Sequence, residues 1–457
     1  MSEQSDHSAN GGTDGTSPQE TWGIYVYFAA DIRNPLMQDG VWETLNALAS
    51  MGSNAQVKIT AMVDLPDRDT EFYILPPRPE NAEKWAVLPA RFLSNVNSAS
   101  IDAILDFLDW SQRNCPAKKV ALIFYGHGYA LDDYDPRVPG VRAYFDGTTS
   151  DQGRSADGFS GQSDNELKLL YDATHNSVLN NFEFAKVIRE YSAKYHDGHR
   201  VEVLGLDCCN MAMVEVLSEL QDSVEYAVAA ETALPFQSWL TKQGLGNFVH
   251  ASSRLTRDFA IGAIQESVDE MAKSNPGMYI ELAACHLIVF PKLEHAMKAL
   301  VDALLPAIER YENRRAIAEA WECDVSYLAD GLIDLASFCE LLQKAIQAGG
   351  CVERAVIDAA NTVIDAVKGT PLPLPEVGNQ GGVVDFSKFA PNRRDENIAL
   401  STGLTIWFPP WIQFPHVYYY QMQQSVNYLF DGYSNTRFAK ATGWDRFLRE
   451  LYRLTQT

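Results

Sequence analysis

Two segments of the sequence place residues able to perform nucleophilic catalysis directly after apolar runs. His127 follows the run VALIFYG (120–126), and two adjacent cysteines, Cys208 and Cys209, follow the run VEVLGLD (201–207). A thiol becomes a strong nucleophile when a neighbouring base takes its proton, and imidazole is the commonest such base. If both runs are neighbouring strands of one parallel sheet, their carboxyl ends meet at one edge. The sequence therefore predicts a Cys–His dyad at that edge.

The residues alone leave two alternatives open. Successive residues of a strand point to opposite faces, so only one of Cys208 and Cys209 can face His127. A Cys at the end of a buried strand is also more often inert packing than a nucleophile. The glycines on both sides of His127 favour a functional role, because they leave room for a substrate backbone beside the ring.

Alternating strands and helices are expected to hold this edge in place. Apolar runs typical of buried strands occupy residues 21–31, 57–65, 118–128, 200–211 and 225–232. Amphipathic helical spacing covers residues 41–53, 100–116 and 180–195. This alternation predicts an α/β fold in which a mostly parallel sheet is flanked by helices.

The C-terminal part of the chain has a different pattern. Residues 291–368 are mostly amphipathic helices and predict an added helical subdomain, followed by a Pro/Gly-rich linker at 369–382. Residues 402–409 then read as one more strand and residues 443–454 as a closing helix.

The composition argues against several classes of protein. The chain has 457 residues, 46% of them hydrophobic, with 60 acidic against 37 basic side chains. This acidic surplus argues against nucleic acid or an anionic membrane as a partner. No apolar stretch is long enough to span a membrane, and the polar residues 1–20 are unlike a signal peptide. We expect a disordered tail over residues 1–20 and a cytoplasmic protein.

The cysteines do not indicate a disulfide framework or a zinc site. There are seven, an odd number, without a CxxC pair and without His at zinc-ligand spacing. We therefore expect reduced thiols and assign no metal site.

The two motifs around the expected dyad resemble the catalytic strands of the clostripain family of cysteine peptidases, which share the fold of caspases, legumain and gingipains. In that family the second motif usually reads Asp-Ala-Cys-Leu-Met before a helix, and residues 207–211 here read Asp-Cys-Cys-Asn-Met. The resemblance implies that Cys209 is the nucleophile and His127 its partner. Further segments similar to the family follow in order: TWGIYVYFAAD (21–31), AAET (229–232), GLTIWFP (403–409) and TGWDRFLREL (442–451).

The resemblance also implies a domain organisation. A caspase-like catalytic domain is expected over residues 21–290, and a helical subdomain with its linker over residues 291–395. The strand and helix in residues 396–457 are expected to return to the core.

Individual roles follow from the same resemblance. Backbone N–H groups of Gly128 and Cys209 would stabilise the oxyanion while His127 protonates the leaving amine. Family members bind a basic P1 side chain with the acidic residue two positions before the nucleophile, which is Asp207 here. A cap on the following helix is the alternative role for this aspartate. Glu231 and Thr232 belong to the segment that forms one wall of the cleft.

The long polar loop over residues 129–169 joins the two catalytic strands. Family zymogens are commonly cut after a basic residue in this loop, and the expected sites are, in order of preference, Lys168, Arg154, Arg142 and Arg137. A lid that stays intact is the alternative. Some family members require calcium, and the acidic residues 132–137 could bind it, although an acidic surface loop is the simpler account.

These features together predict a cysteine endopeptidase that cleaves proteins or peptides after Arg or Lys, without an obligatory cofactor. Two alternatives belong to other classes. One is a caspase-fold binding or scaffold module without proteolytic activity, and the other is a different hydrolase that uses the same dyad.

Overall fold

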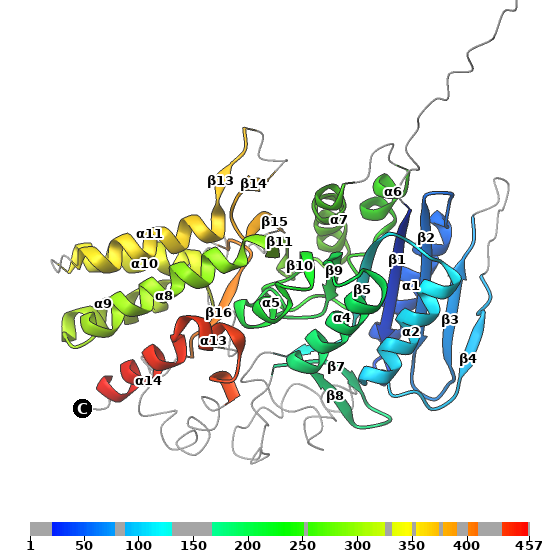
Figure 1. The fold of residues 1–457 in the computed structure, drawn as a ribbon, viewed down its shortest axis with the longest axis horizontal. Coiled ribbons are helices and arrows are strands. Elements are labelled where there is room, and N and C mark those ends of the chain that lie inside the picture. The colour runs from blue at the N-terminus through cyan, green and yellow to red at the C-terminus, as the bar shows by residue number, and fades with distance from the viewer. Residues whose placement is uncertain are drawn as a thin grey trace, which may run out of the picture.

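A nine-stranded sheet in the order β15-β11-β10-β9-β5-β1-β2-β3-β4 forms the centre of the protein (Figure 1). The computed structural model describes residues 21–77, 87–129, 167–250, 255–324, 331–349, 353–373, 378–390, 401–409 and 432–455. The central strands are parallel: β10 (Val224–Ala229), β9 (Val201–Asp207), β5 (Lys119–Tyr125), β1 (Trp22–Ala29) and β2 (Val57–Asp64). The expected α/β fold with a mostly parallel sheet is confirmed.

Antiparallel strands that the sequence pattern did not predict extend both edges of the sheet. They are β3 (Thr70–Leu75) and β4 (Arg91–Leu93) on one side, and β11 (Ile280–His286) and β15 (Val384–Ala390) on the other. β4 has only three residues, and β11 contains Glu and two Ala in place of the usual β-branched residues. Strands of this kind have a weak local signal, so pairing with a neighbour defines them.

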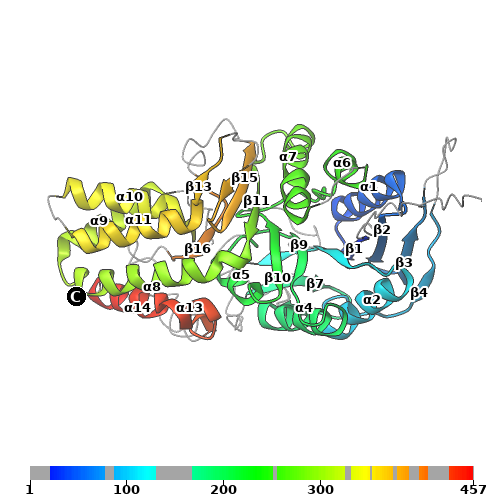
Figure 2. The same cartoon turned by 45° about the horizontal axis from the view of Figure 1, so that its top comes forward.

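Helices cover both faces of the sheet (Figure 2). One face packs against α2 (Ile101–Asn114), α4 (Asn181–Tyr195) and α5 (Val214–Leu220). The other face packs against α1 (Pro35–Met51), α6 (Lys242–His250) and α7 (Thr256–Ser274). β5 lies between these layers and is apolar on both sides, as a central parallel strand must be.

A group of helices lies beyond the β15 edge of the sheet (Figure 1). It consists of α8 (Phe290–Ala307), α9 (Tyr311–Cys323), α10 (Leu335–Ala348) and α11 (Arg354–Lys368). The C-terminal helices α13 (Arg437–Thr442) and α14 (Trp444–Thr455) pack against α8. Within the expected linker, β13 (Thr370–Pro371) pairs with β14 (Asn379–Gln380). No helix in the described ranges is both long and apolar enough to cross a membrane.

The strand expected at residues 402–409 lies outside the central sheet. β16 (Thr405–Trp407) pairs with β12 (Leu332–Asp334) in a separate antiparallel pair, and Thr405 makes one isolated parallel bridge to Met213. β16 therefore joins the helical part to the region after β9 without adding a strand to the sheet. Free thiols are present at Cys115, Cys208, Cys209, Cys285 and Cys339.

Candidate active site

The carboxyl ends of β5 and β9 bring His127 and Cys209 to one pocket. Tyr125 and Asp207 are paired at the ends of these two parallel strands, and each candidate residue follows two positions later. The pocket is also lined by Met37, Tyr125, Gly126, Asp207, Cys208, Leu234, Pro235 and Phe236. Its free volume of about 20 Å³ is little more than one water molecule needs. The pocket is therefore closed in this structure.

The two adjacent cysteines have different surroundings. Cys208 is 1% exposed, and its Sγ lies 3.6 Å from the carbonyl oxygen of Phe124 in the core. Burial, with a smaller contribution from Asp207, raises the pKa of Cys208 well above its usual value. Cys209 is partly exposed, and the N–H of Leu234 donates a hydrogen bond of 3.3 Å to its Sγ. Of the two thiols, Cys209 has the surroundings that a reactive thiol needs.

The glycines beside His127 make room for the chain itself and not for a substrate. A Cβ atom on Gly128 would lie 2.1 Å from the carbonyl oxygen of Cys209, and one on Gly126 would lie 2.8 Å from Leu170 Cδ2. The expectation that they leave space for a substrate backbone is therefore wrong in this state. The contact at Gly128 brings the backbone after β5 against the backbone of Cys209. Asn210 then turns the chain with a φ of 59°, which Asn tolerates better than most residues.

The imidazole of His127 is held by its backbone and by aromatic neighbours. β6 (Gly128–Tyr129) pairs with β7 (Lys168–Asp172), and the N–H of Leu170 donates a 2.8 Å hydrogen bond to the carbonyl of His127. The rings of Tyr129 and Phe236 lie 5.9 Å and 6.2 Å from the imidazole. His127 as a residue is only half-buried, but its Nε2 is buried, and burial lowers the pKa of the ring to about 4. The imidazole is therefore neutral near pH 7.

Asp207 lines the same pocket and does not cap the helix that follows. Its carboxylate accepts a hydrogen bond from Ser238 Oγ, and α5 begins only at Val214, after Met213, without a side-chain cap. Burial raises the pKa of Asp207 to about 7, although hydrogen bonds from Ser238 and the backbone of Trp239 oppose the shift. The carboxyl group is therefore close to its midpoint of ionisation at neutral pH.

Glu231 and Thr232 do not line this pocket. Glu231 is 0% exposed, its carboxylate accepts a hydrogen bond from Ser401 Oγ, and its N–H donates a 2.8 Å bond to Glu281. Thr232 is buried, and its carbonyl accepts a 3.0 Å hydrogen bond from the N–H of Asn210. We expected Glu231 and Thr232 to form one wall of the cleft, but they lie elsewhere in this structure. After β10 the chain first turns toward residue 401, and it reaches the pocket only at Leu234.

The carboxyl group of Glu231 belongs to a buried cluster that also contains Glu281 and Asp334. Asp334 begins α10 and accepts hydrogen bonds from the N–H groups of Ser337 (2.8 Å) and Thr402 (2.6 Å). Burial is the main cause that raises the pKa of all three carboxyl groups, that of Glu281 to about 8. This carboxyl cluster joins the central sheet to the helical part of the protein.

Leu234, Pro235 and Phe236 cover the thiol, and the sequence analysis did not identify them. The hydroxyl of Tyr125 donates a 2.6 Å hydrogen bond to the carbonyl of Phe236, while Leu234 contacts the Cys209 thiol as described above. A usable signal was present, since Leu-Pro-Phe is an unusually apolar sequence for a loop directly after a strand.

The expected cleavage sites divide into one that the structure describes and three that it does not. Lys168 is 4% exposed and begins β7, where it is paired with both Tyr129 and Asn180. A protease needs an accessible extended segment, so Lys168 is not a suitable site in this conformation, contrary to expectation. Arg137, Arg142 and Arg154 lie outside the described residues, as do the acidic residues 132–137 proposed for calcium.

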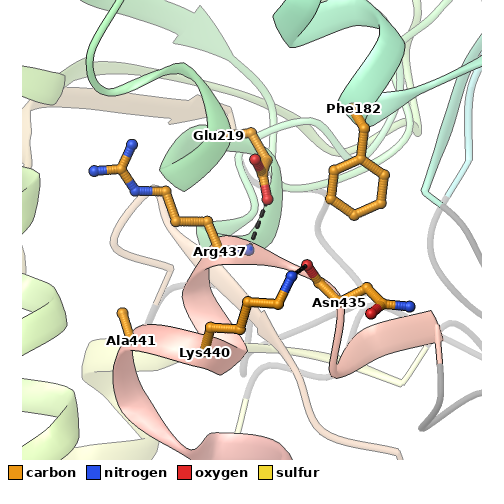
Figure 3. A pocket seen from close by; sticks show the side chains of 6 residues that line it. All are labelled: Phe182, Glu219, Asn435, Arg437, Lys440 and Ala441. Atoms are coloured by element: carbon orange, nitrogen blue, oxygen red, sulfur yellow. Dashed lines mark hydrogen bonds between the residues drawn. The ribbon is translucent and has the colours of Figure 1, made fainter.

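A second and wider groove, of about 630 Å³, lies where α4, α5 and α13 meet (Figure 3). Phe182, Glu219 and Ala441 are among the residues that line it. Its polar groups have partners within the chain, because Glu219 accepts a 2.6 Å bond from the Arg437 N–H and Lys440 donates a 2.6 Å bond to the carbonyl of Asn435. The lining contains neither thiol nor imidazole, so we assign no chemistry to this groove.

One group of side chains in the described ranges has the spacing of metal ligands. Ligand atoms of Asp31, Asp172 and His175 all lie within 4.8 Å of one another. Asp31 follows β1, Asp172 is the last residue of β7, and His175 lies in the turn that follows β7.

Comparisons with known proteins identify the family. The family model of the clostripain family matches residues 155–450, a range that includes Asp207 and Cys209 but begins after His127. A comparison with curated proteins gives no match.

Solved structures extend the similarity toward the N-terminus. Three of them cover 93% of this chain and 99% of their own chains. They are an inactive zymogen C11 protease from Parabacteroides distasonis (TM-score 0.55, 13% identity), the secreted C11 cysteine protease iotapain from Bacteroides thetaiotaomicron (0.59, 12%), and a secreted C11 cysteine protease from the same species with an irreversible peptide inhibitor (0.54, 13%). At these identities the likeness is one of fold. Because the family model matches well over half of the sequence, the chain belongs to the clostripain family of cysteine peptidases.

Proposed function

We propose that this protein is an endopeptidase that cleaves protein or peptide substrates after Arg or Lys, with Cys209 as the nucleophile and His127 as its base. The observation that carries the proposal is the shared pocket. His127 and Cys209 reach it from neighbouring parallel strands, while the Cys208 thiol lies against Phe124 in the core.

The proposed reaction uses the neutral imidazole as a base. His127 takes the proton of the Cys209 thiol, the sulfur attacks the scissile carbonyl, and the imidazolium then protonates the leaving amine. The backbone N–H groups of Gly128 and Cys209 are the proposed oxyanion donors, and the close packing of these two residues supports this role. Water hydrolyses the acyl-enzyme and regenerates the thiol.

Asp207 is the residue proposed to bind and select the P1 side chain of the substrate. Among the described residues that line the pocket, it is the only one with a carboxyl group, and none of them is Lys or Arg. Its pKa of about 7 reflects burial without a charged partner, so a guanidinium or ammonium group entering the pocket would favour the ionised form. An uncharged P1 side chain would leave this carboxyl group without a charged partner.

The closed pocket supports a zymogen. The free volume of about 20 Å³ cannot hold an Arg side chain, so the cover formed by Leu234–Phe236 has to move before a substrate binds. We propose that cleavage between Tyr129 and Leu167 accompanies this change, with Arg154 as the preferred site now that Lys168 is found inside a strand. Such a cut would release one end of β7, the strand whose Leu170 holds the backbone of His127.

Covalent labelling tests the dyad and the specificity together. A peptidyl-arginine acyloxymethyl ketone should label the wild type and Cys208→Ala at Cys209, and should leave Cys209→Ala unlabelled. The matched control is the same probe with citrulline at P1, which keeps the shape of Arg and removes its charge and should react at least about 10-fold more slowly. Labelling of Cys208, or equal rates with both probes, would contradict the assignment.

Mass spectrometry tests the processing step separately. Wild type and Cys209→Ala are incubated with and without calcium, and the new termini are identified. We expect cleavage after Arg154, Arg142 or Arg137 in the wild type only. An uncut wild type that still hydrolyses a peptidyl-arginine substrate would remove processing from the proposal while leaving the peptidase activity intact.

A further inference from the structure

Three buried aspartates meet at the carboxyl ends of β1, β2 and β7. Asp31 follows β1, Asp64 is the last residue of β2, and Asp172 is the last residue of β7, with 4%, 3% and 0% of their surfaces exposed. His175 lies in the turn between β7 and β8 (Ser177–Asn180), and its side chain is 23% exposed. Burial of several carboxyl groups in one place is costly unless cations or hydrogen bonds compensate their charge.

Hydrogen bonds satisfy Asp172 but only part of Asp31 and Asp64. Asp172 accepts bonds from the N–H groups of Ser98 (2.9 Å) and His175 (2.8 Å). Oδ2 of Asp31 accepts a 3.2 Å bond from a backbone N–H in the turn after β7, and Oδ1 of Asp64 accepts a 2.7 Å bond from Thr70. The other oxygens, Oδ1 of Asp31 and Oδ2 of Asp64, are buried and have no hydrogen-bond partner among the residues that the structure describes.

The imidazole of His175 is oriented as a metal ligand usually is. Its Nε2 lies 3.2 Å from Oδ1 of Asn95, which accepts a hydrogen bond in the tautomer that carries its proton on Nε2. Nδ1 lies 3.0 Å from both carboxylate oxygens of Asp172. If Nε2 carries the proton of a neutral ring, a lone pair on Nδ1 faces two carboxylate oxygens, which is unfavourable unless a cation lies between them. The alternatives are a neutral ring whose proton lies on Nδ1 and is donated to Asp172, and a doubly protonated ring, and either would compensate at most one of the carboxylate charges.

We propose that Asp31, Asp172 and His175 bind one divalent metal ion that accepts mixed nitrogen and oxygen ligands, of the class of Mn²⁺ or Zn²⁺. Ligand atoms of these three residues lie within 4.8 Å of one another, and the 3.0 Å separation of His175 Nδ1 from Asp172 equals the spacing of adjacent ligands with bonds of about 2.1 Å. The buried carboxyl group of Asp64 lies beside the site and interacts electrostatically with Asp31 and Asp172. An imidazole ligand favours these ions over Ca²⁺ or Mg²⁺, which bind mainly oxygen.

The bound ion would fasten the turn after β7 to the end of β1. The backbone already links them, because the N–H of Ala173 donates a 2.8 Å bond to the carbonyl of Asp31. The same strand carries Leu170, whose N–H holds the carbonyl of His127 at 2.8 Å. The proposed ion would therefore have a structural role, because it would stabilise the position of β7. Its binding would not depend on the proposed peptidase activity.

A titration with Mn²⁺ tests the site directly. The full chain carrying Cys209→Ala, which prevents self-cleavage, is treated with EDTA, desalted and titrated with MnCl₂ while electron paramagnetic resonance measures the free ion. We expect one bound Mn²⁺ per chain and an increase in Tm of a few degrees or more. Adding Asp31→Asn or His175→Gln should weaken binding at least about 10-fold. His175 is partly exposed, so this second variant keeps the test valid if Asp31→Asn does not fold.

The matched control is Glu281→Gln, which changes a buried carboxyl group at the other end of the sheet that also has one oxygen without a described hydrogen-bond partner. It should bind Mn²⁺ as the parent does. Absence of stoichiometric binding, or equal binding by the parent, Asp31→Asn and His175→Gln, would overturn the site. Displacement of Mn²⁺ by an equal concentration of Ca²⁺ would overturn the assignment of the imidazole as a ligand.

Discussion

The neighbouring strands β9 and β10 end at the same edge of the sheet, but their ends have different surroundings. β9 leads to Asp207 and Cys209, which line the closed pocket, whereas β10 leads to Glu231, which contacts Ser401 and Glu281. Burial raises the pKa of both Asp207 and Glu231. A buried carboxyl group with a raised pKa is thus not a sufficient sign of a substrate site. The segment that packs beyond the strand end distinguishes the two: it is the apolar segment Leu234–Phe236 in one case and the helical part in the other.

The largest expected effect concerns the two thiols at the end of β9. Cys209→Ala should lower kcat/KM on peptidyl-arginine substrates by on the order of 10⁴-fold or more, because the nucleophile is removed. Cys208→Ala should change it only a few-fold, since that sulfur packs in the core. Steady-state assays of both variants decide this. A dead Cys208→Ala and an active Cys209→Ala would mean that the assignment is wrong by one residue.

The second prediction compares how Asp207 and Glu231 affect cleavage after a charged and after an uncharged P1 residue. Asp207→Asn should weaken cleavage after Arg by on the order of 2–3 kcal/mol, because a desolvated charged pair loses one partner. Cleavage after an uncharged residue should change little. Glu231→Gln is the control from the neighbouring strand, and it should not alter the ratio of the two rates. Equal losses on both substrates in Asp207→Asn would show that this residue supports the dyad and does not select P1.

The third prediction concerns the stability of the contact between sheet and helices. Asp334→Ala should lower the free energy of unfolding by about 1–2 kcal/mol, because it removes the N-cap of α10 and the acceptor of the Thr402 N–H. Urea unfolding measures the change. The control on the same helix is Glu340→Ala, which breaks the half-exposed ion pair with Lys368 and should cost less than about 1 kcal/mol. Similar losses of unfolding free energy in both variants would contradict the prediction that the carboxyl cluster stabilises the contact between the sheet and the helices.

The fourth prediction is a pH dependence within the carboxyl cluster. The pKa of Glu281 is raised from 4.5 to about 8, so the folded protein keeps a proton that the unfolded chain releases. Its contribution to stability is therefore complete below about pH 4.5 and is lost as the pH rises toward 8. Glu281→Gln cannot ionise and should flatten this decline by up to several kcal/mol, because each pKa unit corresponds to about 1.4 kcal/mol. Urea midpoints across this pH range provide the measurement, and an unchanged slope would contradict the assignment.

The parallel core and the meeting of His127 with a cysteine could be predicted from the sequence. Both depend on local patterns, because continuous apolar runs indicate buried strands and parallel strands share one carboxyl edge. Helices α1, α2 and α4 were predictable for the same reason, since their apolar positions recur with the helical period, whereas α6 and α7 were not predicted. β11 was not, because its Glu and Ala residues become a strand only between β10 and β15.

The details of the site required the tertiary structure. In the sequence, Asp207 lies at the end of one predicted strand, and Glu231 and Thr232 lie at the end of another. Local sequence patterns do not reveal which segment packs against each of these strand ends. Lys168 borders a polar loop in the sequence, but strand pairing with Tyr129 and Asn180 buries it. Leu234–Phe236 cover Cys209 because Tyr125 and the thiol, distant in sequence, hold them there.

Residue type and period therefore determined which side chains could carry out the chemistry and on which elements they lie. Long-range packing decided which thiol is buried in the core, which carboxyl group lines the pocket, and that the pocket is closed. The physical reason is that the direction of a strand follows from its own residues, whereas the surroundings of its end depend on segments that only folding brings together.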